Sequence, residues 1–319
     1  MPLIVTRAEY PVTSQEEKVF TTYRNYAAAF LVLIEHGYPT VGEQKETLER
    51  VLDRSTAQPG LDVGKICQLL TGAWSTELLM TQFQQEGSEV AIKYANVWSP
   101  VQSYYAIYLA GTAWLESLGI SPRDHRATLN ALTNRLAEVT CYPWNVTCAG
   151  IPRASDISFV GLAHPNFGSV SNLAIPRDFE TAEMLLAKAL KTTRDGLIDE
   201  RGERWKKEHP LRGGRKRTNL PSGKRDELAS RLKPTSILHF LQRARLRTNY
   251  KEADAFVTGS IDMPNARHFY EAQVSLTTRT LLLFEALIGS RFGAAFVQSA
   301  ATRFSSDVGS STPSSERWS

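Results

Sequence analysis

The sequence has few of the residues that build metal sites and disulfide frameworks. It contains three cysteines and six histidines in 319 residues. Cys67, Cys141 and Cys148 are odd in number and are not spaced as paired metal ligands. This pattern is typical of reduced thiols in a cytoplasmic protein. We therefore expect no metal site, and nothing in the sequence indicates a cofactor.

Long apolar runs and common catalytic motifs are also missing. The longest runs, Ala27–Ile34 and the stretch around Leu281–Phe284, are shorter than the ~20 residues that cross a bilayer. The first residues lack the charged start and apolar middle of a signal peptide. A phosphate-cradling glycine loop, a His-Glu zinc pair and a nucleophile elbow are absent as well. We expect a cytoplasmic protein with no membrane partner. We expect none of the chemistry that a phosphate-binding glycine loop, a His-Glu zinc pair or a nucleophile elbow supports.

Positive charge is concentrated in one part of the chain. Residues 201–251 contain sixteen Lys or Arg and four Asp or Glu, although the net charge of the whole chain is only +4. The rest of the chain is therefore acidic. Such asymmetry favours a polyanionic partner for one face, and nucleic acid before a membrane. The alternative is a solvated basic loop without a partner.

Capping signals and helical spacing predict an all-α protein. Ser14 and Glu17 form a capping box, and Gly37 followed by Pro39 ends the helix that they begin. We expect an antiparallel helical bundle with one irregular inserted lobe, which includes a small hairpin or irregular structure. The expected parts are a single helical domain over 1–304, the inserted lobe at 141–176, a flexible basic loop at 201–233 and a disordered tail at 305–319.

The predicted helix at 234–250 combines a core-facing side with a polar side. At 100° per residue, an apolar stripe that includes Ile237 and Leu241 lies on one side. The other side carries His239, Arg243, Arg247 and Tyr250. Arg245 falls on the flank of the apolar side, where an unpaired guanidinium is costly. It is either a buried strut that ties helices together or a functional residue.

Two stretches resemble HEPN domains. Residues 103–113 (SYYAIYLAGTA) with 119–126 (GISPRDHR) are similar to one helix pair of that family, and residues 241–250 (LQRARLRTNY) with 253–254 are similar to a later segment. The resemblance covers about half of the chain. It implies a bundle of four or five helices. Many HEPN proteins are metal-independent ribonucleases of toxin–antitoxin and anti-phage systems, and others only bind nucleotides, RNA or a partner protein.

The resemblance also implies a site. The family's Arg is followed four to six residues later by a His, usually shared across a dimer. Here Arg245 is followed by Tyr250 where the His would stand. The Arg would hold a phosphate and the His would move a proton, whereas a tyrosine with a pKa near ~10 is a poor base but can orient a phosphate.

The candidate site residues form three groups. The catalytic candidates are Arg245, Arg247 and Tyr250, and a second Arg–His pair is Arg204 and His209. His125 and His239 are further candidates, although capping or surface roles are the simpler interpretation for both. The candidate nucleic-acid-binding residues are Arg243, His239, Lys206, Lys207, Arg215, Lys216 and Arg217.

Two functions are consistent with these patterns. The first is a HEPN-like RNA-binding protein or metal-independent endoribonuclease, in bacterial anti-phage defence or a toxin system. The second is a non-catalytic helical adaptor that forms a homodimer or binds a partner protein.

Overall fold

A computed structural model describes residues 14–52, 60–139, 141–153, 155–211, 214–257 and 261–318. Thirteen α-helices and a small three-stranded sheet occur in these ranges, so the predicted all-α class is confirmed. The N-terminal half contains α1 (Gln15–Gly37), α2 (Val41–Val51), α3 (Val63–Glu86), α4 (Glu89–Ala95), α5 (Ser99–Ser117), α6 (His125–Glu138), β1 (Thr147–Gly150) and β2 (Ile157–Val160). The remainder contains the short helix η1 (Phe167–Ser169), α7 (Phe179–Glu208), α8 (Lys224–Ser230), β3 (Thr235–Ser236), α9 (Ile237–Leu246), the π-helix η2 (Arg247–Lys251), α10 (Ala253–Val257), α11 (Met263–Phe292), α12 (Ala294–Val308) and α13 (Pro313–Trp318).

Local capping explains where several helices begin. The side chain of Ser14 accepts a hydrogen bond from the Glu17 N–H, and Glu17 accepts one from the Ser14 N–H, as the capping box predicts. Asp178 and Asp262 cap α7 and α11 through one hydrogen bond each, which the Asp side chain accepts from the N–H of the residue three positions later. α6 begins at His125 with Asp124 as its cap.

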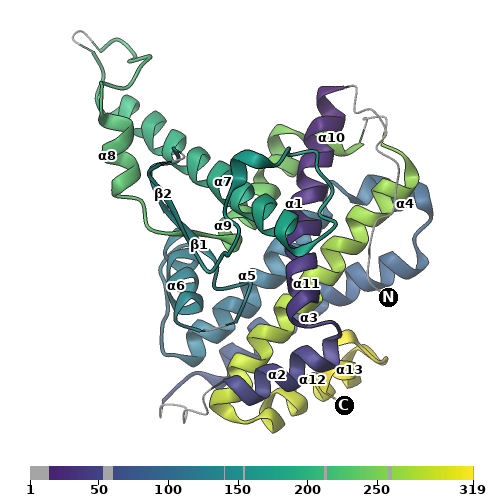
Figure 1. The fold of residues 1–319 in the computed structure, drawn as a ribbon. Helices are drawn as coiled ribbons and strands as arrows, with labels where there is room; N and C mark the ends of the chain where they lie inside the picture. Colours follow the sequence, from purple (N-terminus) through teal and green to yellow (C-terminus); the bar gives the residue numbers. More distant parts are fainter. Residues whose placement is uncertain are drawn as a thin grey trace.

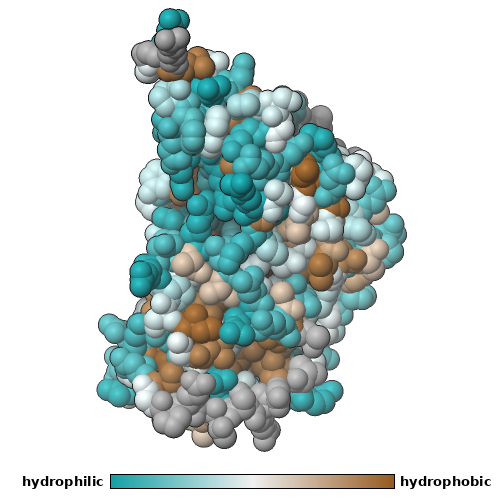
Figure 2. Space-filling view, turned by 90° about the vertical axis from the view of Figure 1, so that its left-hand side faces the viewer, coloured by the Kyte–Doolittle hydropathy of each residue, from teal (hydrophilic) through white to brown (hydrophobic). Residues whose placement is uncertain are grey.

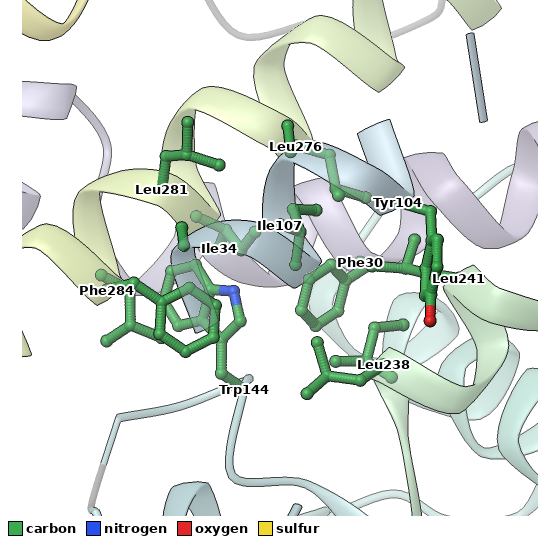
Figure 3. Packing of buried hydrophobic residues seen from close by; sticks show 14 of the residues in the cluster. Phe30, Ile34, Tyr104, Ile107, Trp144, Leu238, Leu241, Leu276, Leu281 and Phe284 are labelled. Carbon is green, nitrogen blue, oxygen red and sulfur yellow. The ribbon is translucent and has the colours of Figure 1, made fainter. Parts of the chain in front are cut away.

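The hydrophobic core lies where α1, α5, α9 and α11 meet. Phe30 and Ile34 of α1 pack with Ile107 of α5 and Phe284 of α11, and all four are essentially inaccessible to solvent (Figure 3). In Figure 1, α1 crosses in front of α11, and α2, α12 and α13 lie together at the lower end of the molecule. Burial of this apolar surface is the main contribution to the stability of the bundle.

The predicted insertion at 141–176 contains the expected hairpin and is joined to the core. β1 pairs antiparallel with β2, and on its other edge with β3, where Cys148 lies opposite Thr235. Trp144 precedes this sheet and is fully buried, and its indole N–H donates to the Thr280 hydroxyl of α11 at 3.1 Å. The lobe is therefore held to the bundle by strand pairing, by the buried Trp144 side chain and by hydrogen bonds to Glu183 and Arg194 of α7.

Two expectations are wrong for the described residues. The basic segment 201–233 is not one flexible loop, because α7 continues to Glu208 and α8 occupies Lys224–Ser230. Arg, Glu and Lys are good helix formers, and the helix therefore extends through the charged run. The tail from 305 is also ordered up to residue 318, in α12 and α13, because Arg317 and Trp318 are buried against the bundle. No helix in the described ranges combines the length and apolar character of a membrane span.

Candidate nucleic-acid interface

A groove of about 850 Å³ runs between α6, α7 and α9. Its walls carry seven cationic and three acidic side chains. The cationic residues are Arg126, Arg201, Arg204, Lys207, Lys233, Arg243 and Arg247, and the acidic ones are Asp199, Glu200 and Glu203. The C-terminal part of α7 and α8 form a projection (Figure 1), and residues 199–207 of that part of α7 supply one wall of the groove. Figure 2 shows that hydrophilic side chains cover this projection, whereas apolar side chains gather on the lower part of the same face.

The acidic side chains do not neutralise the groove. Asp199 is paired with Arg225, and Glu203 lies 2.5 Å from the Nζ of Lys206. Neither of these cations lines the groove. Burial lowers the pKa of Arg201, and the nearby charges of Arg126 and Arg204 lower it further. This repulsion between like charges in a concave site is relieved when an anion binds.

The predicted polar side of the 234–250 helix faces this groove. Arg243 and Arg247 both line it, and Tyr250 at its rim is 70% exposed. The guanidinium of Arg247 lies 2.6 Å from a carboxylate oxygen of Glu252. Arg243 also lines a neighbouring groove of about 540 Å³, whose walls come from α1 and α7 and include Tyr23. The two grooves therefore share one cationic wall residue.

His239 lines the groove as a neutral side chain. It is 8% exposed, and its Nδ1 accepts a hydrogen bond from the Ser236 N–H at 3.3 Å. Burial lowers the pKa of His239 to about 4, and the charges of Arg126 and Arg194 act in the same direction. Because Nδ1 is an acceptor, the proton of the neutral ring is on Nε2. His239 is thus a capping residue that can donate a hydrogen bond and is not a base in this tautomer.

Two of the predicted basic residues at 206–217 stabilise the segment that follows α7. Lys206 donates to the Thr218 carbonyl at 2.9 Å, and Arg217 donates to the His209 carbonyl at 3.1 Å. The His209 ring stacks on Trp205 with 4.4 Å between centroids. Of these predicted residues, Lys207 lines the groove, whereas Arg215 and Lys216 are exposed outside it.

The two predicted Arg-based catalytic sets are not assembled in this groove. Arg204 lines it, but His209 is stacked on Trp205 and is not a lining residue. Arg245 projects from the other side of α9, and its guanidinium lies over Tyr105 at 4.7 Å from the ring centroid. No carboxylate in the described ranges pairs with it. The structure therefore brings Arg247 and Tyr250 together at the groove and leaves Arg245 apart from them.

Sequence reasoning missed three cations of the groove. Arg126 lies in the first turn of α6, far from the basic segment in sequence, and only the packing of α6 against α9 brings it to the site. Arg201 and Lys233 lie in the basic segment, but nothing in their spacing distinguished them from their neighbours. Within the described part of the chain, no group of His, Cys, Asp and Glu is arranged to hold a metal ion.

A scan against protein-family models and searches of curated proteins and of solved structures found no match to this chain. The groove and its charges are thus the main evidence on function.

Proposed function

We propose that this protein binds single-stranded RNA in the groove between α6, α7 and α9. The observation that carries the proposal is the excess of cations. Seven basic side chains, of which Arg247 is paired with Glu252, face three carboxylates, and two of these carboxylates are already paired with Arg225 and Lys206. Phosphate contacts of this kind supply most of the affinity in sequence-independent nucleic-acid binding.

The concave shape and an exposed tyrosine favour a single strand. Single-stranded binders combine a cationic groove, which follows the backbone, with aromatic side chains on which bases stack. Tyr250 is exposed at the rim, and Arg243 connects this groove to the second one at α1 and α7. Such a path suits an extended polymer. The resemblance to HEPN domains supports RNA as that polymer.

Binding is favoured over cleavage in this groove. A metal-independent ribonuclease needs a base that takes a proton from the ribose hydroxyl. His239 has Nδ1 engaged with Ser236, and the phenol of Tyr250 serves as a hydrogen-bonding group rather than as a base. RNA cleavage in the presence of EDTA, lost in His239→Gln, would add a catalytic role to the binding role.

The test is fluorescence anisotropy with a labelled single-stranded RNA over a series of salt concentrations. Arg204→Glu with Lys207→Glu reverses two exposed groove charges, and Arg50→Glu is the matched control on the exposed end of α2. We expect the groove variant to bind about 10- to 100-fold more weakly, with a shallower salt dependence, because about two phosphate contacts are lost. Equal losses in the groove variant and the control, or salt-independent binding, would contradict the proposal.

A second candidate function is that of a helical adaptor. The observation in its favour is a set of large apolar side chains that α3, α4 and the following turn leave exposed, namely Leu79, Phe83, Val90, Tyr94 and Trp98. Exposed apolar surface of this kind marks contacts between proteins. Leu79→Lys with Tyr94→Lys would then abolish dimers or partner binding in light-scattering measurements and leave RNA binding unchanged.

A further inference from the structure

Five side chains from three helices meet on the side of α9 that faces away from the RNA groove. Tyr104, Tyr105 and Tyr108 come from α5, His125 is the first residue of α6, and Arg245 comes from α9. The His125 ring lies 4.2 Å from the Tyr108 ring and 6.0 Å from the Tyr104 ring, between centroids. The Arg245 guanidinium lies 5.4 Å from the Tyr104 centroid and 4.7 Å from that of Tyr105.

Three polar atoms in this cluster are buried and lack a hydrogen-bond partner among the described residues. They are the Tyr104 hydroxyl, Nδ1 of His125 and Nε of Arg245. Tyr104 is 2% exposed, so its hydroxyl is shielded from bulk water. Unpaired buried polar atoms are costly and uncommon in folded proteins. Three of them on touching side chains indicate that a polar ligand completes the site.

We propose that the Tyr104–His125–Arg245 cluster is a binding site for a phosphate group. A cationic ligand does not fit, because the faces of Tyr104 and Tyr105 are already covered by the guanidinium of Arg245. That guanidinium has no carboxylate partner in the described ranges, so its remaining N–H groups suit an oxyanion.

The protonation states also suit an anion. Burial raises the pKa of Tyr104, so its hydroxyl remains a donor at neutral pH. Burial, followed by the charge of Arg245, lowers the pKa of His125, while Asp124 acts in the opposite direction. A neutral His125 can present one N–H to the ligand. The Tyr108 hydroxyl is already used, because it donates to Thr128 at 3.2 Å.

A ligand can reach the cluster from the surface. Tyr105, Tyr108, His125 and Arg245 are each half-buried, so part of every one of them meets solvent. The phosphate can belong to a free mononucleotide or to the end of an RNA strand. The second source is within reach because Arg126, the neighbour of His125, lines the RNA groove. The site itself does not rest on the RNA proposal.

The experiment is isothermal titration calorimetry with inorganic phosphate, adenosine 5′-monophosphate, and a short RNA with and without a 5′-phosphate. Tyr104→Phe removes only the unpaired hydroxyl, and Tyr108→Phe is the matched control, since its hydroxyl is bound to Thr128. We expect Tyr104→Phe to weaken phosphate binding about tenfold or more, and Tyr108→Phe to change it by less than about twofold. Tyr104→Phe should also melt no lower than the wild type, because it removes an unpaired buried group.

The outcomes separate the alternatives. Preferential binding of the 5′-phosphorylated RNA identifies a strand end as the source, and equal binding of the mononucleotide identifies a free nucleotide. No binding of any phosphate probe at about 10 mM overturns the inference, as does equal binding by the wild type, Tyr104→Phe and Arg245→Gln. The groove variant Arg204→Glu with Lys207→Glu should keep phosphate binding, so that failure of the RNA proposal and failure of this one are distinguishable.

Discussion

The Nη2 of Arg317 lies 2.5 Å from a carboxylate oxygen of Glu285, and both side chains are buried. Glu77 of α3 is the second carboxylate, 2.6 Å from Nη1 of the same guanidinium. The indole N–H groups of Trp74 and Trp318 also donate to Glu285. Burial alone would lower the pKa of Arg317, but Glu285 and Glu77 raise it above its usual range. This cluster connects α13 to α3 and α11.

Arg317→Ala is expected to destabilise the protein by about 3–5 kcal/mol, because two buried carboxylates lose their counter-ion. Urea denaturation at neutral pH measures the free energy of unfolding. Arg303→Ala, on the exposed side of α12, is the control and should change stability by less than about 0.5 kcal/mol. Similar stability of Arg317→Ala and the wild type would mean that α13 is not docked in solution.

His239→Gln is expected to remove part of the acid sensitivity of the fold. The pKa of His239 is lowered from 6.5 to about 4. The stability that it contributes is therefore complete above pH 6.5 and is lost as the pH falls toward 4, because only the unfolded chain binds the proton. At about pH 5, the contribution of His239 to the free energy of unfolding of the wild type should be about 2 kcal/mol smaller than at neutral pH.

Gln is the appropriate replacement because it keeps a capping box with Ser236 and does not titrate. Urea denaturation of both proteins at about pH 7.5 and about pH 5 gives the comparison. The same loss of stability in both proteins on acidification would show that His239 is not buried in its neutral form.

Gly111→Val is expected to destabilise the protein by about 1–3 kcal/mol through overpacking. A Cβ atom at Gly111 would lie 2.9 Å from Cδ1 of Leu132 and 3.2 Å from Cζ of Phe284, where α5, α6 and α11 meet. Gly37→Val is the control, because nothing lies within 4 Å of a Cβ there. The melting temperatures of both variants in thermal unfolding give the comparison. Equal melting temperatures for the two variants would contradict the close approach of α5 to α6.

Glu252→Gln is expected to strengthen RNA binding about two- to fivefold, because it releases Arg247 from its ion pair. The salt dependence should become steeper, as one more cation becomes available to phosphate. Glu138→Gln removes an exposed carboxylate beside Arg135 near the C-terminal end of α6 and is the control. Unchanged or weaker binding by Glu252→Gln alone would place Arg247 outside the RNA-binding surface.

Local sequence patterns were sufficient to predict several helices and the side of α9 that lines the groove. The Ser14–Glu17 capping box and the Asp178 and Asp262 caps depend on neighbours three residues away, so they can be read without knowledge of the fold. The helical period also separated Arg243 and Arg247 from Arg245 on α9, and the structure places the first two in the groove and the third against α5.

The tail and the sites depend on contacts between distant residues. The Ser-rich composition after 304 predicts disorder, yet Arg317 and Trp318 order the end of the chain through Glu77 and Glu285. Arg126 enters the groove, and His125 meets Arg245, because α6 packs beside α5 and α9.

By itself, the sequence determined the helical class, several helix starts and the excess of positive charge around α7 and α9, because each of these follows from near neighbours or from composition. Only the tertiary structure decided which cations share a concave surface and which polar atoms are buried without a partner. Both properties are set by the packing of helices that are distant in the chain, and no local pattern encodes them.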